Sequence, residues 1–260
     1  IDDFYGRKLL KSLKGKDLKV ITYGMSKDAD YRIENVEESL NGLRFNIVTS
    51  MYVLKVSSLL IGLPNVYNIA SAISASEFLG IDKEIIIEAV KKFPPVTGRF
   101  EKMKLDQDFS VVIDYAHTPD ALKKVILSLR KLTKGRLITV FGCGGNRDKG
   151  KRPEMGSIAS KLSDFVIITS DNPRWEDPKI IIKDILKGIE RDNFAVLEDR
   201  AEAIAKAVKI AKKGDIILLA GKGHEDYQEI AGIKKYFNDK DIVEKVIKNK
   251  SEVWFCPDIH

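Results

Sequence analysis

Five short, largely apolar runs in the second part of the chain constrain its fold more than any other feature. Amphipathic segments with helical periodicity separate these runs. Strands buried on both faces are continuously apolar, and helices between them allow a parallel sheet covered on both sides. We therefore expect an α/β fold with a Rossmann-like, mostly parallel sheet. The predicted strands are residues 111–114, 137–141, 165–169, 194–197 and 215–220, and residues 228–237 are expected to add an antiparallel edge.

The first part of the chain has a different pattern. Close-set β-prone runs predict antiparallel hairpins, and two helices are expected after them. Asp82 is the expected cap of the second helix, and Pro94-Pro95 ends it because proline has no N–H to donate. We therefore predict domains at residues 1–94 and 95–250, followed by a tail at 251–260. The runs are residues 19–23, 43–50 and 52–61, and the first helix is residues 65–79.

Composition limits the class of protein. The chain carries 44 Lys and Arg against 38 Asp and Glu, a net charge of +6, and the two signs are mixed along it. No basic stripe with interleaved aromatic residues indicates nucleic-acid binding, and no apolar run approaches the roughly 18 residues that span a bilayer. The two cysteines form no disulfide framework. We expect a cytoplasmic monomer that binds neither nucleic acid nor membrane.

The loop at residues 142–153 nearly matches two nucleotide fingerprints. Gly145, Gly150 and Lys151 have the P-loop spacing, but Arg152 stands where a Ser or Thr should bind magnesium. Similarly, Arg147 stands where a dinucleotide motif needs its third glycine. Arginine presents paired donors to carboxylate or phosphate. The residues alone fit an anion site and an exposed basic turn equally well.

Three further loops at strand ends carry ligand-type residues. Asp171 to Arg174 combine an acceptor for an ammonium group with donors for a carboxylate, which suits an amino acid. Ordinary turn chemistry explains the same residues. His117 and Glu225 stand in the other two loops. Because the carboxyl ends of parallel strands meet at one edge, we expect these loops to open onto one crevice.

Together these residues resemble the Mur ligase family of peptidoglycan synthesis, in particular its diaminopimelate-adding branch. The motifs occur in the family's order and cover residues 2 to about 248, and Asp-Asn-Pro-Arg is the branch signature. They are Gly62-Leu-Pro-Asn65-Val-Tyr-Asn68, Gly98-Arg99-Phe-Glu101, Asp114-Tyr-Ala-His117-Thr-Pro-Asp120, residues 142–153, Asp171-Asn-Pro-Arg174 and Gly221-Lys-Gly-His-Glu225.

The resemblance implies roles for individual residues. It implies no catalytic side chain and no metal ligand within this sequence. The implied site for meso-diaminopimelate consists of Arg147, Asp171, Asn172, Pro173, Arg174, Gly221 and Glu225. The implied ATP-facing residues are Asn65, Asn68, Arg99, Asp114 and His117.

The resemblance also implies a reaction. In this family ATP, with Mg²⁺, phosphorylates the D-Glu carboxylate of UDP-MurNAc-L-Ala-D-Glu, and the diaminopimelate amine attacks the acyl phosphate to form an amide. The family's UDP-binding domain, P-loop and modified lysine are not recognisable here. The metal ligands are accordingly expected in the missing N-terminal part, and residues 1–260 alone are expected not to catalyse ligation.

Three alternatives remain open. The chain could be a non-catalytic amino-acid-binding module derived from a Mur ligase, or part of a lysine-adding Mur ligase. A nucleotide-dependent oxidoreductase is disfavoured, because no complete G-x-G-x-x-G follows a predicted strand.

Overall fold

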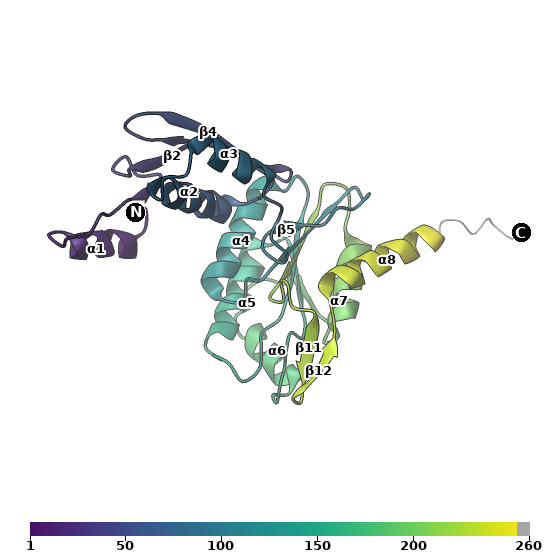
Figure 1. Ribbon diagram of the computed structural model, residues 1–260. Helices are drawn as coiled ribbons and strands as arrows, with labels where there is room; N and C mark the ends of the chain where they lie inside the picture. Colours follow the sequence, from purple (N-terminus) through teal and green to yellow (C-terminus); the bar gives the residue numbers. More distant parts are fainter. Residues whose placement is uncertain (254–260) are drawn as a thin grey trace, which may run out of the picture. The chain divides into compact units, whose positions relative to one another are not determined.

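The computed structural model describes residues 1–253, and the surroundings of side chains through residue 249. The chain forms two compact units, Ile1–Pro95 and Val96–His260 (Figure 1). Of the predicted tail 251–260, the last seven residues lie outside the described part, and the first three complete helix α8 (Asp239–Val253). Within residues 1–253 no helix has both the length and the apolar composition needed to cross a membrane.

The first unit is a four-stranded sheet with two helices packed on it. Its strands are β1 (Tyr23–Gly24), β2 (Tyr31–Ser39), β3 (Gly42–Val48) and β4 (Val53–Ser58), in that order. The pair β3–β4 is antiparallel, which confirms the hairpin predicted from residues 43–50 and 52–61. The pair β2–β3 is also antiparallel, whereas β1 pairs with β2 in parallel, and of the predicted run 19–23 only Tyr23 lies in a strand. The helices are α2 (Leu63–Phe78) and α3 (Lys83–Lys92), and the side chain of Asp82 caps α3 as predicted.

Two elements of the first unit were not predicted. Helix α1 (Phe4–Leu13) begins at Asp3, whose carboxylate accepts from the backbone N–H groups of Tyr5 and Gly6, and it buries none of its residues. Strand β2 is rich in glutamate, and Ile33 is its one buried residue, so the alternation of apolar and polar residues along it is weak. The prediction of hairpins alone for this region was therefore wrong, because neither element has a continuous apolar signal.

The second unit contains a six-stranded sheet in the order β5-β6-β10-β7-β8-β9. All neighbouring pairs are parallel except β5–β6. The five predicted strands are confirmed, with ends that differ by at most one residue. The strands are β5 (Glu101–Lys102), β6 (Ser110–Asp114), β7 (Leu137–Phe141), β8 (Phe165–Ile168), β9 (Phe194–Val196) and β10 (Ile216–Ala220).

Helices cover both faces of this sheet, as the apolar runs predict (Figure 1). The first face carries α4 (Pro119–Leu132), α5 (Lys151–Leu162) and α6 (Pro178–Leu186), and the second carries α7 (Arg200–Ile210) and α8. Alternate strand residues such as Ile138, Val140 and Ile217 pack with Ala203, Ile204, Ala207 and Val208 of α7.

The predicted antiparallel edge at residues 228–237 is wrong. Strands β11 (Tyr227–Ile230) and β12 (Ile233–Tyr236) pair with each other as a separate two-stranded sheet. Strand β12 is fully exposed, so it has no buried face to hold it against the main sheet. The antiparallel edge is β5 instead, at the opposite end from β9.

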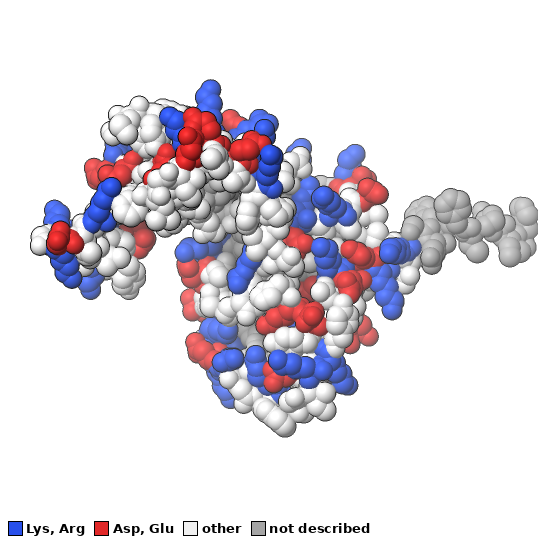
Figure 2. Space-filling model, in the orientation of Figure 1, with Lys and Arg blue, Asp and Glu red and all other residues white. Residues whose placement is uncertain are grey.

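Charged side chains of both signs are intermixed on the surface. On the face drawn in Figure 2, Lys and Arg lie among Asp and Glu over both units. A potential of one sign is therefore not built up over that face.

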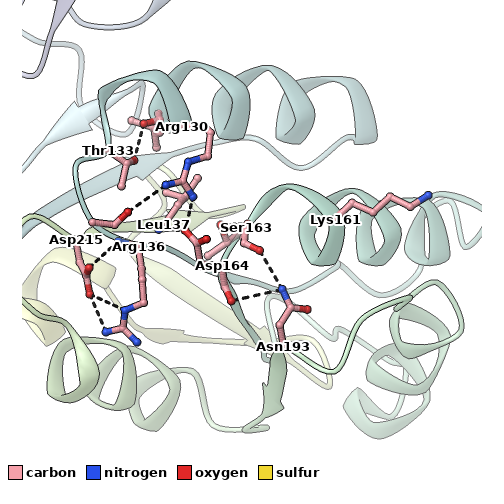
Figure 3. Close-up of polar contacts among 12 residues, drawn as sticks. Arg130, Thr133, Arg136, Leu137, Lys161, Ser163, Asp164, Asn193 and Asp215 are labelled. Atoms are coloured by element: carbon pink, nitrogen blue, oxygen red, sulfur yellow. Dashed lines mark hydrogen bonds and ion pairs between the residues drawn. The ribbon is translucent and has the colours of Figure 1, made fainter.

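A network of carboxylates lies at the amino ends of the parallel strands (Figure 3). Asp215, before β10, accepts from the backbone N–H, Nε and Nη2 of Arg136 and from the backbone N–H of Lys212. Asp164, before β8, accepts from the backbone N–H of Leu137 and pairs with Arg130. These carboxylates take up backbone donors that the sheet ladder leaves unpaired.

Replacing Asp215 should destabilise the second unit. Burial alone would raise the pKa of Asp215, but the hydrogen bonds from Arg136 and Lys212 outweigh it and hold that pKa below its usual value. Asp215→Asn turns two donors toward the donors of Arg136, so we expect a loss of about 1.5–3 kcal/mol in the free energy of unfolding at pH 7. Urea unfolding followed by circular dichroism measures it.

The same experiment tests the pH dependence. Because the folded pKa lies below the unfolded value, the contribution of Asp215 is present above about pH 4 and is lost as pH falls through the folded pKa. The difference between wild type and Asp215→Asn should therefore shrink below about pH 4. Asp120→Asn, which removes an exposed pair with Lys124, is the control and should change unfolding by less than about 0.5 kcal/mol. Equal effects of the two substitutions would contradict the assignment.

Candidate functional site

A cavity of about 370 Å³ lies at the carboxyl ends of the parallel strands in the second unit. Loops that follow β6, β7, β8 and β10 form its wall, because those four strands are adjacent and parallel. The crevice expected from the sequence is therefore present. Among its lining residues are His117, Arg147, Asp171, Asn172, Arg174, Gly221 and Glu225.

Glycines allow the loops to approach one another closely. A Cβ atom at Gly142 would lie 2.2 Å from the carbonyl oxygen of Thr169, and one at Gly145 would lie 1.9 Å from that of Pro173. The backbone N–H of Gly145 also donates to the carbonyl of Asn172 at 2.9 Å. The glycines that half-match nucleotide fingerprints thus fit against the loop after β8. Pro173 itself is buried, and it is not among the lining residues.

Three carboxylates line the cavity, and that of Asp148 accepts from the backbone N–H of Gly150 at 2.8 Å. Asp171 is 8% exposed, and its carboxylate accepts no hydrogen bond from the described residues. Glu225 accepts from Nδ2 of Asn172 at 2.8 Å. Gly221 has φ +111°, and a Cβ atom there would lie 2.7 Å from Oδ2 of Asp171, so glycine leaves room for this carboxylate. A buried carboxylate without a donor is suited to a cationic ligand group.

Two guanidinium groups and the ammonium group of Lys151 line the cavity, and the latter donates to the carbonyl of His117 at 2.6 Å. Arg174 has φ +53°, and its side chain is held by the carbonyl of Gly145 at 3.0 Å and the carboxylate of Glu229 at 3.3 Å. Arg147 is exposed and has no hydrogen bond or ion pair within residues 1–249. One arginine is therefore fixed in place, while the other keeps all its donors for a ligand.

Arg152 has a structural role that its position in the sequence did not reveal. Its side chain is fully buried, and its guanidinium pairs with Glu176 and Asp184, both at 3.0 Å. The hydrogen bond from Arg152 is the main cause that lowers the pKa of Glu176 to about 2. Arg152 stands where a P-loop would carry its magnesium-binding hydroxyl, and it joins the loop after β7 to that after β8.

Lys222 is the residue of this site that sequence reasoning missed. It is fully buried, and its Nζ donates to Oδ1 of Asn172 at 3.0 Å and to the carbonyl of Tyr227 at 2.6 Å. Burial lowers its pKa, against the attraction of Asp171 and Glu225. The available signal was a lysine between two glycines at a strand end, but its partners come from a different loop.

The residues expected to face ATP have different surroundings. The carboxylate of Asp114 is buried and accepts from the backbone N–H groups of Phe100 and Ala116, both at 2.8 Å. Burial raises its pKa in spite of those hydrogen bonds. The Arg99 guanidinium lies 4.5 Å from the centroid of the Tyr115 ring, and both Tyr115 and His117 line the cavity. Asp114 therefore shapes the backbone around the cavity.

Asn65 and Asn68 lie in the first unit, one turn apart on α2. Nδ2 of Asn65 donates to the carbonyl of Ile61 at 2.8 Å, and its Oδ1 accepts from Nδ2 of Asn68 at 3.1 Å. Among the side-chain amide groups, one N–H of Asn65 and one N–H and Oδ1 of Asn68 have no hydrogen bond within the described residues. Their proposed contact with ATP stays a prediction.

No metal site forms among the residues that the structure describes. No three His, Cys, Asp or Glu side chains converge there as a bound cation requires. The side chains of these residues alone therefore form no complete Mg²⁺ site, and the phosphates of a nucleotide would have to supply further ligands.

Known proteins match both units. Residues 98–223 match the glutamate ligase domain of Mur ligases, and residues 1–76 match the Mur ligase middle domain. The chain is 46% identical over 250 residues to the UDP-N-acetylmuramoyl-L-alanyl-D-glutamate–2,6-diaminopimelate ligase of Clostridium botulinum, with 95% of this chain and 51% of the relative covered. Ligase 1 of the same name from Clostridium acetobutylicum is 48% identical over 250 residues, with 95% and 51% covered.

A solved structure of a ligase of this name agrees with the fold. It is 39% identical, has a TM-score of 0.67, and the match covers 96% of this chain and 52% of that one. The chain spans about half the length of the curated relatives it matches. Since its two units match two successive domains of one family, the chain belongs to the Mur ligase family.

Proposed function

We propose that the chain is part of an ATP-dependent ligase that adds meso-diaminopimelate to the D-Glu carboxylate of UDP-MurNAc-L-Ala-D-Glu. The observation that supports this most directly is the cavity in which Asp171 and Glu225 lie with Arg147 and Arg174. The names of the relatives, which are diaminopimelate ligases, point to the same reaction. The substrates are small molecules, and we propose a cytoplasmic monomer.

The charges of the cavity suit a ligand that is zwitterionic at both ends. Diaminopimelate carries an ammonium and a carboxylate group at each end, whereas lysine lacks the second carboxylate. The carboxylates of Asp171 and Glu225 would accept from an ammonium group. Within residues 1–249, neither Nη2 of Arg174 nor any side-chain donor of Arg147 has a hydrogen-bond partner. Both guanidinium groups would therefore bind a carboxylate. Lysine would leave some of these donors without a partner.

The second unit would hold the nucleophile for amide formation. The free amine of diaminopimelate attacks the carbonyl carbon of an acyl phosphate, the C–O bond to phosphate breaks, and the nitrogen loses a proton. ATP, when bound, supplies the phosphoryl group that activates the carboxylate. We propose that Arg99 and His117 face the nucleotide from the second unit, while Asp114 positions Arg99 by holding the adjacent Phe100 N–H. Asn65 and Asn68 would contact it from the first.

Alanine substitutions of Arg147 and Arg174 should distinguish an effect on ligand binding from an effect on the stability of the fold. Arg147 has no partner among residues 1–249, so Arg147→Ala should weaken meso-diaminopimelate binding by about 1.5–3 kcal/mol and change unfolding by less than about 0.5 kcal/mol. Arg174→Ala should weaken binding similarly and also lower stability by about 1 kcal/mol, since the carbonyl of Gly145 loses its donor. Isothermal titration calorimetry and urea unfolding measure the two effects. Unchanged affinity in both variants would refute the assignment.

Selectivity should identify the amino acid. The unmodified chain is expected to bind meso-diaminopimelate at least about tenfold more tightly than L-lysine, because the second carboxylate adds charge-assisted hydrogen bonds worth about 1.4 kcal/mol or more. Competition calorimetry measures the ratio. Tighter binding of lysine would favour a lysine-adding ligase instead. Truncating Arg147 should bring the two affinities closer, which links the preference to the guanidinium groups.

A further inference from the structure

Lys222 occupies an unusual position for a lysine. It follows Gly221 at the end of β10, and its side chain is fully buried beside the cavity, although it is not among the lining residues. A lysine is almost never fully buried unless its ammonium group is paired and hydrogen-bonded. The structure shows which groups satisfy it, and two of them belong to the amino-acid site.

The first of these groups is the side-chain amide of Asn172. Its Oδ1 accepts from Nζ of Lys222 and from the backbone N–H of Glu229, both at 3.0 Å. Both partners can only donate, so the amide oxygen must point to them and the NH₂ group to the other side. That NH₂ group donates one hydrogen to Glu225 at 2.8 Å and keeps the other. Asn172 can therefore meet a ligand only as a donor.

The second group is the carboxylate of Glu225. Its Oε2 lies 3.7 Å from Nζ of Lys222 and receives the Asn172 hydrogen bond as well. One ammonium group thus fixes an amide from the loop after β8 and a carboxylate from the loop after β10. The carbonyl of Tyr227 takes a further donor at 2.6 Å, which ties Lys222 to β11. The ammonium group has little freedom to move.

The charge of Lys222 also balances the site. Asp171 and Glu225 both line the cavity and are both acidic, so a buried cation beside them offsets their negative charge. The other two fully buried cations already have carboxylate partners: Arg152 pairs with Glu176 and Asp184, and Arg200 pairs with Asp239 through two hydrogen bonds of 2.8 and 2.7 Å. Lys222 is therefore the buried cation, among the described residues, that contacts Glu225 directly.

We propose that Lys222 is a positioning residue for the amino-acid ligand, acting through Asn172 and Glu225 rather than by contact. It sets which face of the Asn172 amide meets the ligand and holds the Glu225 carboxylate where an ammonium group can reach it. This inference rests on the proposed function for the identity of the ligand. The coupling between Lys222 and Asn172 can be measured without that identity.

A double-mutant cycle tests the proposal. Calorimetry with meso-diaminopimelate compares the unmodified chain, Lys222→Met, Asn172→Ala and the double variant. Lys222→Met should weaken binding about tenfold or more in the unmodified chain but less than about threefold when Asn172 is already alanine, because residues that act through one another are not additive. Equal losses in both backgrounds would overturn the proposal. Lys161→Met, an exposed lysine paired with Glu190, is the control and should leave binding unchanged.

A second measurement keeps the proposal open to refutation if Lys222→Met unfolds. In the otherwise unmodified chain, the ¹⁵N resonance of the Lys222 ammonium group should shift when meso-diaminopimelate saturates the cavity, and an unmoved resonance overturns the role. A chain that binds no meso-diaminopimelate refutes the proposed ligand instead. If no meso-diaminopimelate binds, the Lys222 ¹⁵N resonance of Asn172→Ala should still differ from that of the unmodified chain. Identical resonances in the two proteins would refute the coupling between Lys222 and Asn172.

Discussion

The parallel pairing of β10 with both β6 and β7 is the constraint on which the second unit depends. Ile217 of β10 is in register with Val111 on one side and with Ile138 on the other. This central strand places the loop after residue 220 between the loops after β6 and β7. Segments separated by more than a hundred residues thereby meet at one edge, and every contact of the cavity follows from that arrangement.

Buried charge is the second feature that organises this edge. Arg152, Arg200 and Lys222 are each fully buried. Arg152 and Arg200 pair with carboxylates from other segments, whereas Lys222 pairs with Glu225 of its own loop and donates to Asn172 of the loop after β8. Removing one partner of such a pair costs more than the pair contributes, because the remaining charge stays desolvated. These pairs therefore fix which loops lie together, whereas the side chains of Asp171 and Arg147 have no hydrogen bond or ion pair within residues 1–249.

The parts of the fold that were predictable have a local cause. The five strands were found because each is an apolar run between helical segments, and the cap at Asp82 was found because its side-chain oxygen accepts from a backbone N–H only two residues later. The position of β10 between β6 and β7 could not be read in this way, since it depends on pairing between distant segments. Helix α1 was not predicted, because it packs no residue into a core and its sequence therefore gave no reason to expect a buried helix.

The same distinction applies to the site. Residues at strand ends were identified as candidates from their chemistry. Six of the seven residues proposed to bind the amino acid line the cavity. The roles of Arg152, Lys222 and Asp114 were not readable, because each is defined by a partner that local sequence does not specify. Asp114 was expected to face a nucleotide, whereas its carboxylate is occupied by two backbone N–H groups.

The close approach at Gly142 and Gly145 has a consequence for how such a site can diversify. There the distance between the loops is fixed by main-chain atoms, and no side chain separates them. Exchanging a ligand-facing residue such as Arg147 therefore leaves the frame unchanged. A side chain at either glycine, by contrast, would push the two loops apart and alter the width of the cavity.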